Sequence, residues 1–227
     1  MRIVIAGGHG KIARHLTRQA SARGYDVVGL VRNPDHVADL EADGGSAAVL
    51  DVESAAVGEV AEVLRGADAV VFAAGAGPGS SAERKDTVDR AGAVLLADGA
   101  ETAGVRPYLL VSSIGVDSVR DGATPEGMDD VFVAYLRAKL AAEQDVLARE
   151  GLDAVALRPA ALSDDEATGQ VHLAPSVDRG RIPRADVAAV ALGLLERVAD
   201  GTLRRGTVLG LDGGDTPVDE AVSAVCG

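Results

Sequence analysis

MRIVIAGGHGKIARHL, residues Met1–Leu16, is the stretch that decides the fold of this 227-residue chain. The apolar run at residues 3–6 is typical of a buried strand. The apolar pattern then resumes at helical spacing with Ile12, Ala13 and Leu16. The stretch therefore predicts a strand, a glycine-rich turn and a helix in direct succession.

The turn contains three glycines, which fit either Gly8-x-Gly10-x-x-Ala13 or Gly7-x-x-Gly10-x-x-Ala13. Glycines at such positions let the backbone approach a pyrophosphate, and the free N–H groups at the helix start then face the phosphates. A tight structural turn is the alternative, because a chain with 28 glycines forms such spacings by chance. The strand before and the helix after the turn favour dinucleotide binding. We predict cofactor contacts from Gly7, Gly8, His9, Gly10, Lys11 and Ile12.

Strands and helices alternate along the rest of the chain. Strands are predicted at residues 3–6, 26–31, 47–50, 69–73, 107–111 and 152–157, with a further short strand at 171–173. Helices are predicted at residues 11–23, 35–42, 54–65, 83–103, 131–149 and 187–198, with a surface loop at 117–129. The apolar segments 207–211 and 218–225 close the chain. This alternation predicts an α/β protein with a Rossmann-type doubly wound parallel sheet. No linker separates a second unit, so we expect a single domain, residues 1–227, in which residues 159–227 contribute a small substrate-side cap.

Composition restricts the classes of partner. The formal net charge of −13 disfavours nucleic acids and anionic membranes. The hydrophobic content of 47% is enough for a packed core, and the aromatic content of 2% makes that core aliphatic. No apolar run is long enough to span a bilayer, and no leader precedes the first strand, so a cytoplasmic protein is expected. We expect a small-molecule partner, with monomer and homodimer both open.

Arg32 closes the second predicted strand, at the position that contacts the adenosine ribose in dinucleotide-binding folds. An arginine there can pair with a 2′-phosphate, so NADP is predicted over NAD, and a solvated loop arginine is the alternative. Asp51 ends the third strand and either contacts the adenine or serves as a turn residue. Ala73, Ala74 and Gly75 follow the fourth strand, where small residues let the backbone lie against the nicotinamide half of the cofactor. A flexible loop is the alternative there.

Tyr135 and Lys139 lie four residues apart and so share one face of the helix predicted at 131–149. Ser112 and Ser113 follow the fifth strand, at the carboxyl edge where open parallel sheets bind ligands. The spacing points to a tyrosine and lysine acting together. The alternative is an amphipathic helix with a half-buried tyrosine and a solvated lysine.

These motifs, in this order, resemble the short-chain dehydrogenase/reductase superfamily. Arg158-Pro159 after the sixth strand belongs to the same set. The chain is most similar to the atypical branch of small NAD(P)-binding oxidoreductases and epimerase-like proteins. The segments LRPAALSDDEATGQV (157–171) and RADV (184–187) extend the resemblance over nearly the whole chain.

The resemblance implies roles for individual residues. Tyr135 would be the general acid/base, and Lys139 the cation that assists it and holds the nicotinamide ribose. Ser113 would hydrogen-bond the substrate oxygen, with Ser112 as the reserve candidate. Ser112 and Pro159 are also expected to contact the cofactor. Asp89 stands where many relatives carry an asparagine, and a polar helix residue is its alternative interpretation.

The resemblance implies an NADP-dependent oxidoreductase that acts on a small carbonyl or alcohol. An NADP-dependent epimerase or dehydratase, and an NADP-binding redox sensor without catalysis, are the alternatives. His9 and His172 are weak acid/base candidates. No metal site is expected, because the consecutive acids at 164–166 do not share one face of regular structure.

Overall fold

The computed structural model describes residues 1–77 and 79–226. Within these residues the main sheet has nine strands, in the order β11-β8-β10-β6-β5-β4-β1-β2-β3. Seven of them run parallel: β1 (Arg2–Ala6), β2 (Asp26–Val31), β3 (Ser46–Val49), β4 (Ala69–Phe72), β5 (Pro107–Val111), β6 (Asp153–Pro159) and β10 (Val208–Gly213). At one edge β8 (Gln170–Ala174) runs antiparallel to β10, and β11 (Thr216–Pro217) runs antiparallel to β8. The predicted doubly wound parallel sheet is confirmed.

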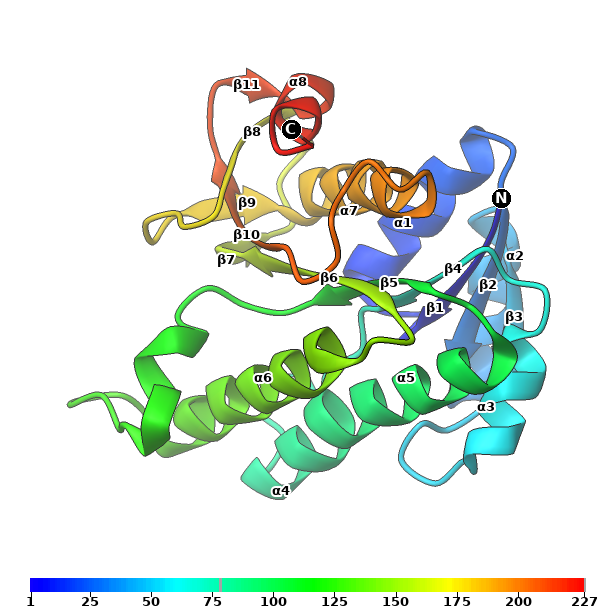
Figure 1. Ribbon diagram of the computed structural model, residues 1–227, viewed down its shortest axis with the longest axis horizontal. Helices are drawn as coiled ribbons and strands as arrows, with labels where there is room; N and C mark the ends of the chain where they lie inside the picture. Colours follow the sequence, from blue (N-terminus) through cyan, green and yellow to red (C-terminus); the bar gives the residue numbers. More distant parts are fainter. Residues whose placement is uncertain (78, 227) are drawn as a thin grey trace.

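Helices cover both faces of the sheet (Figure 1). One face carries α1 (Lys11–Ala22) and α7 (Arg184–Ala199), with α8 (Val218–Ala224) packed on α7. The other face carries α3 (Val57–Leu64), α5 (Gly92–Ala103) and α6 (Asp130–Ala148). The short η1 (Pro34–His36) and α2 (Val37–Ala42) connect β2 to β3.

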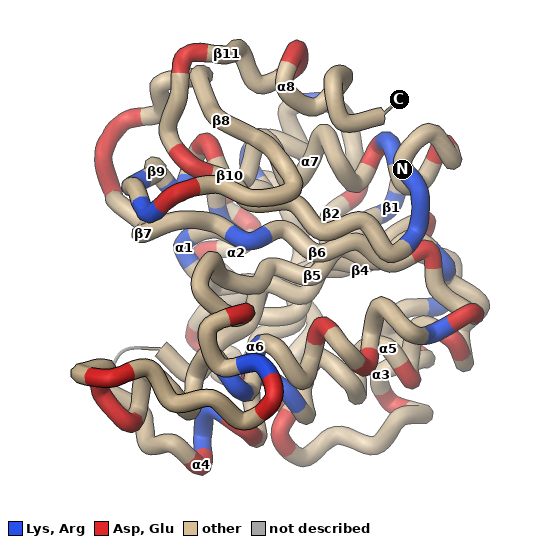
Figure 2. The backbone as a smooth tube through the Cα atoms, turned by 60° about the vertical axis from the view of Figure 1, so that its left-hand side comes forward, with Lys and Arg blue, Asp and Glu red and all other residues tan. Residues whose placement is uncertain are grey.

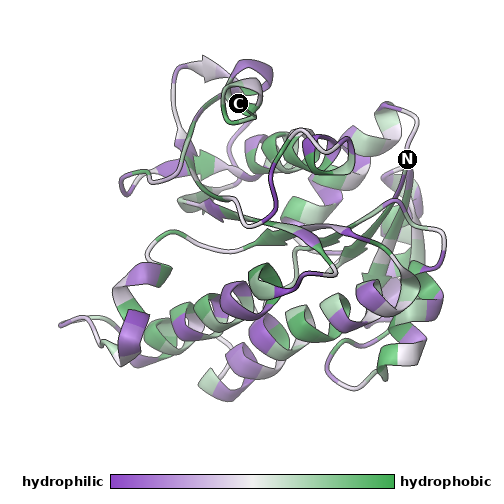
Figure 3. Ribbon diagram, viewed as in Figure 1, coloured by the Kyte–Doolittle hydropathy of each residue, from purple (hydrophilic) through white to green (hydrophobic). Residues whose placement is uncertain are grey.

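The core follows from the two-residue period of the strands. In β1, Ile3 and Ile5 pack into the core under α1 and α7, whereas Val4 and Ala6 pack into the core under α3 and α5. Apolar colouring accordingly runs along the strands and the inner sides of the helices (Figure 3). Charged positions lie mostly on the surrounding helices and loops (Figure 2). Among the described residues, no helix combines the length and apolarity needed to cross a bilayer.

Two helices that were predicted before β5 differ from the structure. The helix expected at 83–103 is divided into α4 (Ala82–Arg84), a π-helical segment η2 (Lys85–Ala91) and α5. The helix expected at 54–65 begins only at Val57, because Asp51 builds a turn before it. The Asp51 carboxylate accepts from the Glu53 N–H, and its carbonyl accepts from the N–H groups of Ser54 and Ala55. Asp51 therefore forms a turn, and its contact with the adenine stays a prediction.

The region after β6 adds structure that the sequence pattern did not predict. The short strands β7 (Ala161–Ser163) and β9 (Arg181–Pro183) pair with each other in a separate parallel sheet. The helix expected to begin at residue 187 begins at Arg184. Before α6, the loop expected at 117–129 contains most of the 3₁₀ segment η3 (Val116–Gly122), whose valines pack on α6. Three-residue strands carry too little periodicity to be recognised from sequence.

We predict that Gly99 is required for the contact between α5 and α3. A Cβ atom at Gly99 would lie 2.5 Å from Cγ1 of Val60, which is fully buried. Overpacking costs roughly 1–3 kcal/mol, against a helix-propensity gain of about 1 kcal/mol for alanine over glycine. Gly99→Ala should therefore lower the free energy of unfolding by up to about 2 kcal/mol, as measured by urea denaturation.

Gly58 provides the matched control on α3, because a Cβ atom there has open space around it. Gly58→Ala should raise the free energy of unfolding by up to about 1 kcal/mol. Equal stability of the two variants would contradict the close packing at Gly99.

Candidate active site

Two adjoining cavities follow the carboxyl edge of the parallel strands. The first, of about 750 Å³, lies beside the ends of β4, β5 and β6 and the first half of α6, and we call it the α6 pocket. The second, of about 430 Å³, lies beside the glycine turn and the ends of β2 and β3, and we call it the glycine-turn pocket. Ala73, Ala74 and Gly75 line both pockets, which therefore form one groove. The groove passes between β1 and β4, the position at which open α/β sheets bind dinucleotides.

The glycines of the turn have different functions. Gly7 has φ +79°, and a Cβ atom on it would lie 2.6 Å from Cα of Ala74. A Cβ atom on Gly8 would lie 2.6 Å from Cα of Gly29. These two glycines are needed for packing of the turn against β2 and the loop after β4. A Cβ atom on Gly10 would meet only two carbonyl oxygens, the nearer at 3.0 Å, so the missing side chain of Gly10 keeps the pocket open at the start of α1. This cradle fits a pyrophosphate.

Three neighbours of these glycines differ in their surroundings. The His9 imidazole lies at the pocket wall, where it stacks on His36 at 3.6 Å and its Nε2 lies 2.7 Å from Asp39. That hydrogen bond lowers the pKa of the Asp39 carboxyl. Lys11 is exposed and pairs with Asp164, and neither Lys11 nor Gly8 lines one of the two pockets. Ile12 lines the α6 pocket.

Arg32 lies at the predicted ribose end of the glycine-turn pocket, and its charge is not isolated there. Its guanidinium is 3.2 Å from Oε2 of Glu53, which also accepts a 2.6 Å hydrogen bond from Arg84. The hydrogen bond from Arg84 lowers the pKa of the Glu53 carboxyl, so Glu53 is negatively charged at neutral pH. Asp51 lines the same pocket. The sequence pattern missed Arg84 and Glu53 because they lie on other elements.

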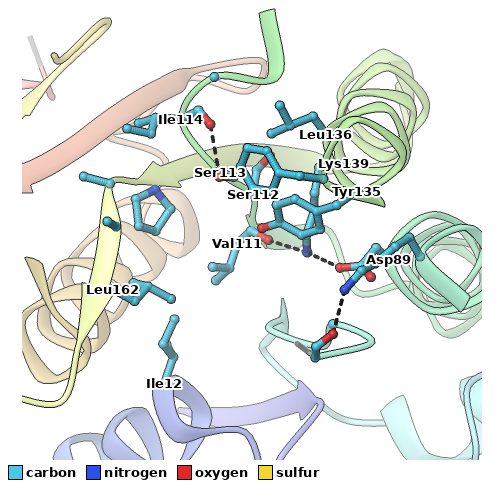
Figure 4. Close-up of a pocket in the computed structure, with 18 of the residues that line it drawn as sticks. Ile12, Asp89, Val111, Ser112, Ser113, Ile114, Tyr135, Leu136, Lys139 and Leu162 are labelled. Atoms are coloured by element: carbon cyan, nitrogen blue, oxygen red, sulfur yellow. Dashed lines mark hydrogen bonds and ion pairs between the residues drawn. The ribbon is translucent and has the colours of Figure 1, made fainter. Parts of the chain in front are cut away.

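Tyr135, Lys139 and Asp89 lie together in the lining of the α6 pocket (Figure 4). Lys139 Nζ lies 3.1 Å from Oδ1 of Asp89 and donates to the carbonyl oxygens of Ala74 and Val111, each at 3.2 Å. It also lies 5.9 Å from the ring centroid of Tyr135. Lys139 is 4% exposed and Asp89 is fully buried. The solvated-lysine interpretation of Lys139 is therefore wrong, and Asp89 is a polar helix residue that is buried beside Lys139.

The two serines after β5 both line the α6 pocket, but their hydroxyl groups differ in hydrogen bonding. The Ser113 hydroxyl donates to the Ile114 carbonyl at 3.1 Å. The Ser112 hydroxyl is buried, and no described residue is its hydrogen-bond partner. A buried hydroxyl without a partner is costly, so it fits a polar group of a bound molecule. Pro159 also lines the pocket.

The remaining polar candidates lie elsewhere or have structural partners. His172 is exposed in β8. Asp164 pairs with Lys11 and with Arg184, which holds the loop after β7 beside the start of α1. The hydrogen bond from Lys11 lowers the pKa of Asp164. Among the described residues, no group of three His, Cys, Asp or Glu side chains could hold a metal ion.

We predict that Gly10→Leu abolishes binding of NADP and NAD, because its side chain occupies the cradle while its backbone at φ −63° suits any residue. Calorimetry with each cofactor and a thermal melt should show lost binding in a folded protein. Gly24→Ala, at a helix end far from both pockets, controls for glycine replacement and should keep cofactor affinity despite some strain at φ +79°. Unchanged affinity in Gly10→Leu would refute the cradle.

Comparisons with known proteins agree with this groove. The model of the NAD(P)H-binding family matches residues 7–197. A Bacillus subtilis (strain 168) protein named sugar epimerase YhfK is 29% identical over 223 residues, which cover 98% of this chain and 99% of that one.

Two solved structures superimpose over nearly the whole chain. A Bacillus halodurans protein described as an NAD-dependent epimerase/dehydratase is 32% identical, with a TM-score of 0.85 and 99% of both chains covered. The oxidoreductase ylbE of Lactococcus lactis is 27% identical, with a TM-score of 0.81 and 99% and 96% coverage. The chain therefore belongs to the NAD(P)H-binding family, as its resemblance to the atypical short-chain dehydrogenases/reductases predicted.

Proposed function

We propose that this protein is an NADP-dependent oxidoreductase that interconverts a small carbonyl compound and its alcohol. The observation that carries the proposal is the cluster of Tyr135, Lys139 and Asp89, which lies in the α6 pocket beside a cofactor cradle. A buried, ion-paired lysine next to a half-exposed tyrosine is costly to maintain unless the site uses it. Its relatives include a protein named as an oxidoreductase.

Each residue has a distinct task in this reaction. The cofactor would supply or accept the hydride. Tyr135 would give its phenolic proton to the carbonyl oxygen, or take it back from the alcohol. Lys139 would stabilise the phenolate charge, because its ammonium is held near the ring by Asp89 and two carbonyl oxygens. Ser113, or the unpartnered hydroxyl of Ser112, would hydrogen-bond the substrate oxygen.

Residues after β6 would complete the site as its cap. Ala160, Ala161 and Leu162 from the β7 segment line the α6 pocket, and so do Arg179, Gly180 and Arg184. This lining supports the expectation that residues 159–227 contribute a substrate-side cap to a single domain.

An epimerase or dehydratase is the second candidate, because two relatives are named or described in those terms. Such enzymes transfer the hydride transiently and regenerate the cofactor, and Tyr135 would serve them equally. Product formed without net consumption of NADPH would identify this class. An NADP-binding sensor without catalysis would keep its cellular effect in Tyr135→Phe.

We predict that Tyr135→Phe lowers kcat for reduction of the carbonyl substrate by roughly 10²–10⁴-fold, because the acid/base proton is lost. Calorimetry should give an NADP dissociation constant within about twofold of wild type. Lys139→Ala should weaken both turnover and NADP binding. Normal turnover by the Phe variant would contradict the assignment of Tyr135.

We predict that the wild type binds NADP more tightly than NAD, because Arg32 and Arg84 flank the predicted ribose end of the glycine-turn pocket. A charge-assisted hydrogen bond of ~1.5–3 kcal/mol corresponds to a ten- to hundredfold preference. Arg32→Asp should erase or invert it with little loss of NAD binding.

Glu53→Gln sharpens this test, because removal of the carboxylate frees both guanidinium groups for the 2′-phosphate. The variant should bind NADP more tightly than wild type and leave NAD affinity within about threefold. Equal affinities of the wild type for NADP and NAD would refute the predicted preference.

A further inference from the structure

Lys85 is a second buried cation in the α6 pocket. It begins the π-helical segment η2, four residues before Asp89, and is 8% exposed. Its Nζ donates to the Gly77 carbonyl at 2.6 Å and lies 5.5 Å from the ring centroid of Tyr135. The Tyr135 ring therefore has an ammonium group near it from each of two elements, η2 and α6.

The two buried ammonium groups differ in their counter-charge. Lys139 has the Asp89 carboxylate at 3.1 Å, so that pair is close to neutral. No carboxylate in the described part of the chain forms an ion pair with Lys85. A buried charge without a counter-charge is strongly unfavourable, and an ammonium group has three N–H donors of which one carbonyl oxygen satisfies one. An anion bound in the pocket would supply both the counter-charge and further hydrogen-bond acceptors for Lys85.

The charged residues that line the rest of the pocket are also mostly positive. Its charged lining residues are four cations and two carboxylates: Lys85, Lys139, Arg179, Arg184, Asp89 and Asp129. Asp89 is paired with Lys139, and Asp129 accepts from the N–H groups of Val131 and Phe132 as the cap of α6. Arg184 is paired with Asp164, so Lys85 and Arg179 are the two lining cations that form no ion pair within the described residues. The chain as a whole has a net charge of −13, so the excess of positive charge in this pocket is a local feature.

The α6 pocket is also lined by apolar side chains. Of the four large hydrophobic side chains that are exposed among the described residues, Val131, Phe132 and Leu162 line this pocket. Phe132 also stacks on Tyr135, with ring centroids 5.7 Å apart. Exposed apolar groups gathered around one cavity mark a ligand site.

We infer that Lys85 binds a carboxylate of the substrate, and that the substrate is a 2-oxo acid, or its 2-hydroxy acid, with an apolar side chain. This inference rests on the proposed function, because it places the substrate carbonyl at Tyr135. Lys85 Nζ lies 5.5 Å from the centroid of the Tyr135 ring, and the inference places the carboxylate on the carbon next to the one whose oxygen exchanges the proton. The apolar part of the substrate packs on Val131, Phe132 and Leu162.

The test compares benzoylformate with 1-phenyl-1,2-propanedione, which has a neutral acetyl group in place of the carboxylate. Calorimetry measures the binding of each to the complex of the full-length protein with NADP. Benzoylformate should bind the wild type at least tenfold more tightly than the dione. Lys85→Met should weaken the binding of benzoylformate at least tenfold. The dissociation constants of the dione and of NADP should stay within about twofold of their wild-type values. Benzoylformate that binds no better than the dione, or not at all, overturns the inference.

Two further measurements separate binding from structural support. Arg90→Met removes an exposed cation from the same η2 segment, where Arg90 pairs with Asp86, and should leave the tenfold preference intact. Lys85→Met should keep or raise the Tm, because it removes an uncompensated buried charge. A lowered Tm with equal weakening of both ligands would show that Lys85 only tethers the loop at Gly77, and would overturn the inference.

The outcomes also separate this inference from the function on which it rests. A wild type that fails to bind NADP contradicts the proposed function itself. A wild type that binds NADP and reduces the dione, but shows no preference for benzoylformate, contradicts the role of Lys85 alone. Loss of NADP affinity in Lys85→Met would assign Lys85 to the cofactor and overturn the substrate assignment.

Discussion

The ammonium group of Lys139 is almost completely removed from water, and the catalytic end of the sheet is organised around satisfying it. Two carbonyl oxygens, at the end of β5 and in the loop after β4, accept hydrogen bonds from it, and the Asp89 carboxylate of the η2 segment forms an ion pair with it. Removing any of these partners would leave a buried charge poorly compensated, which is strongly unfavourable. This requirement fixes α6 against η2 and places Tyr135 at the pocket wall.

The π-helical segment contributes to this arrangement. A π turn is wider than an α turn and occurs frequently at functional sites. Within η2 the buried side chains are Lys85, Val88 and Asp89, so one short segment brings both an ammonium group and a carboxylate to the pocket. Asp89 also accepts from the N–H of Ala76, which holds the loop after β4 in place. The same segment thus supports the cofactor side and the proposed substrate side of the groove.

The groove uses opposite charge arrangements in its two halves. In the glycine-turn pocket, two arginines share one carboxylate, Glu53, and the preference between cofactors depends on how that carboxylate competes with a 2′-phosphate. In the α6 pocket, one ammonium group is neutralised by Asp89 and the other is not. Both halves lie in a strongly acidic protein, so local pairing and not the overall field decides which anions bind.

The sequence by itself determined the parallel sheet, the glycine turn and the Tyr135–Lys139 pair, because each depends on local features: apolar periodicity, glycine spacing and helical phase. Only the tertiary structure decided the charge around these residues. Glu53 reaches Arg32 across 21 positions and Arg84 across 31. Likewise, only the packing of η2 shows that Lys85 and Asp89 are both buried. Such contacts depend on how distant elements pack, and a one-dimensional pattern does not encode that packing.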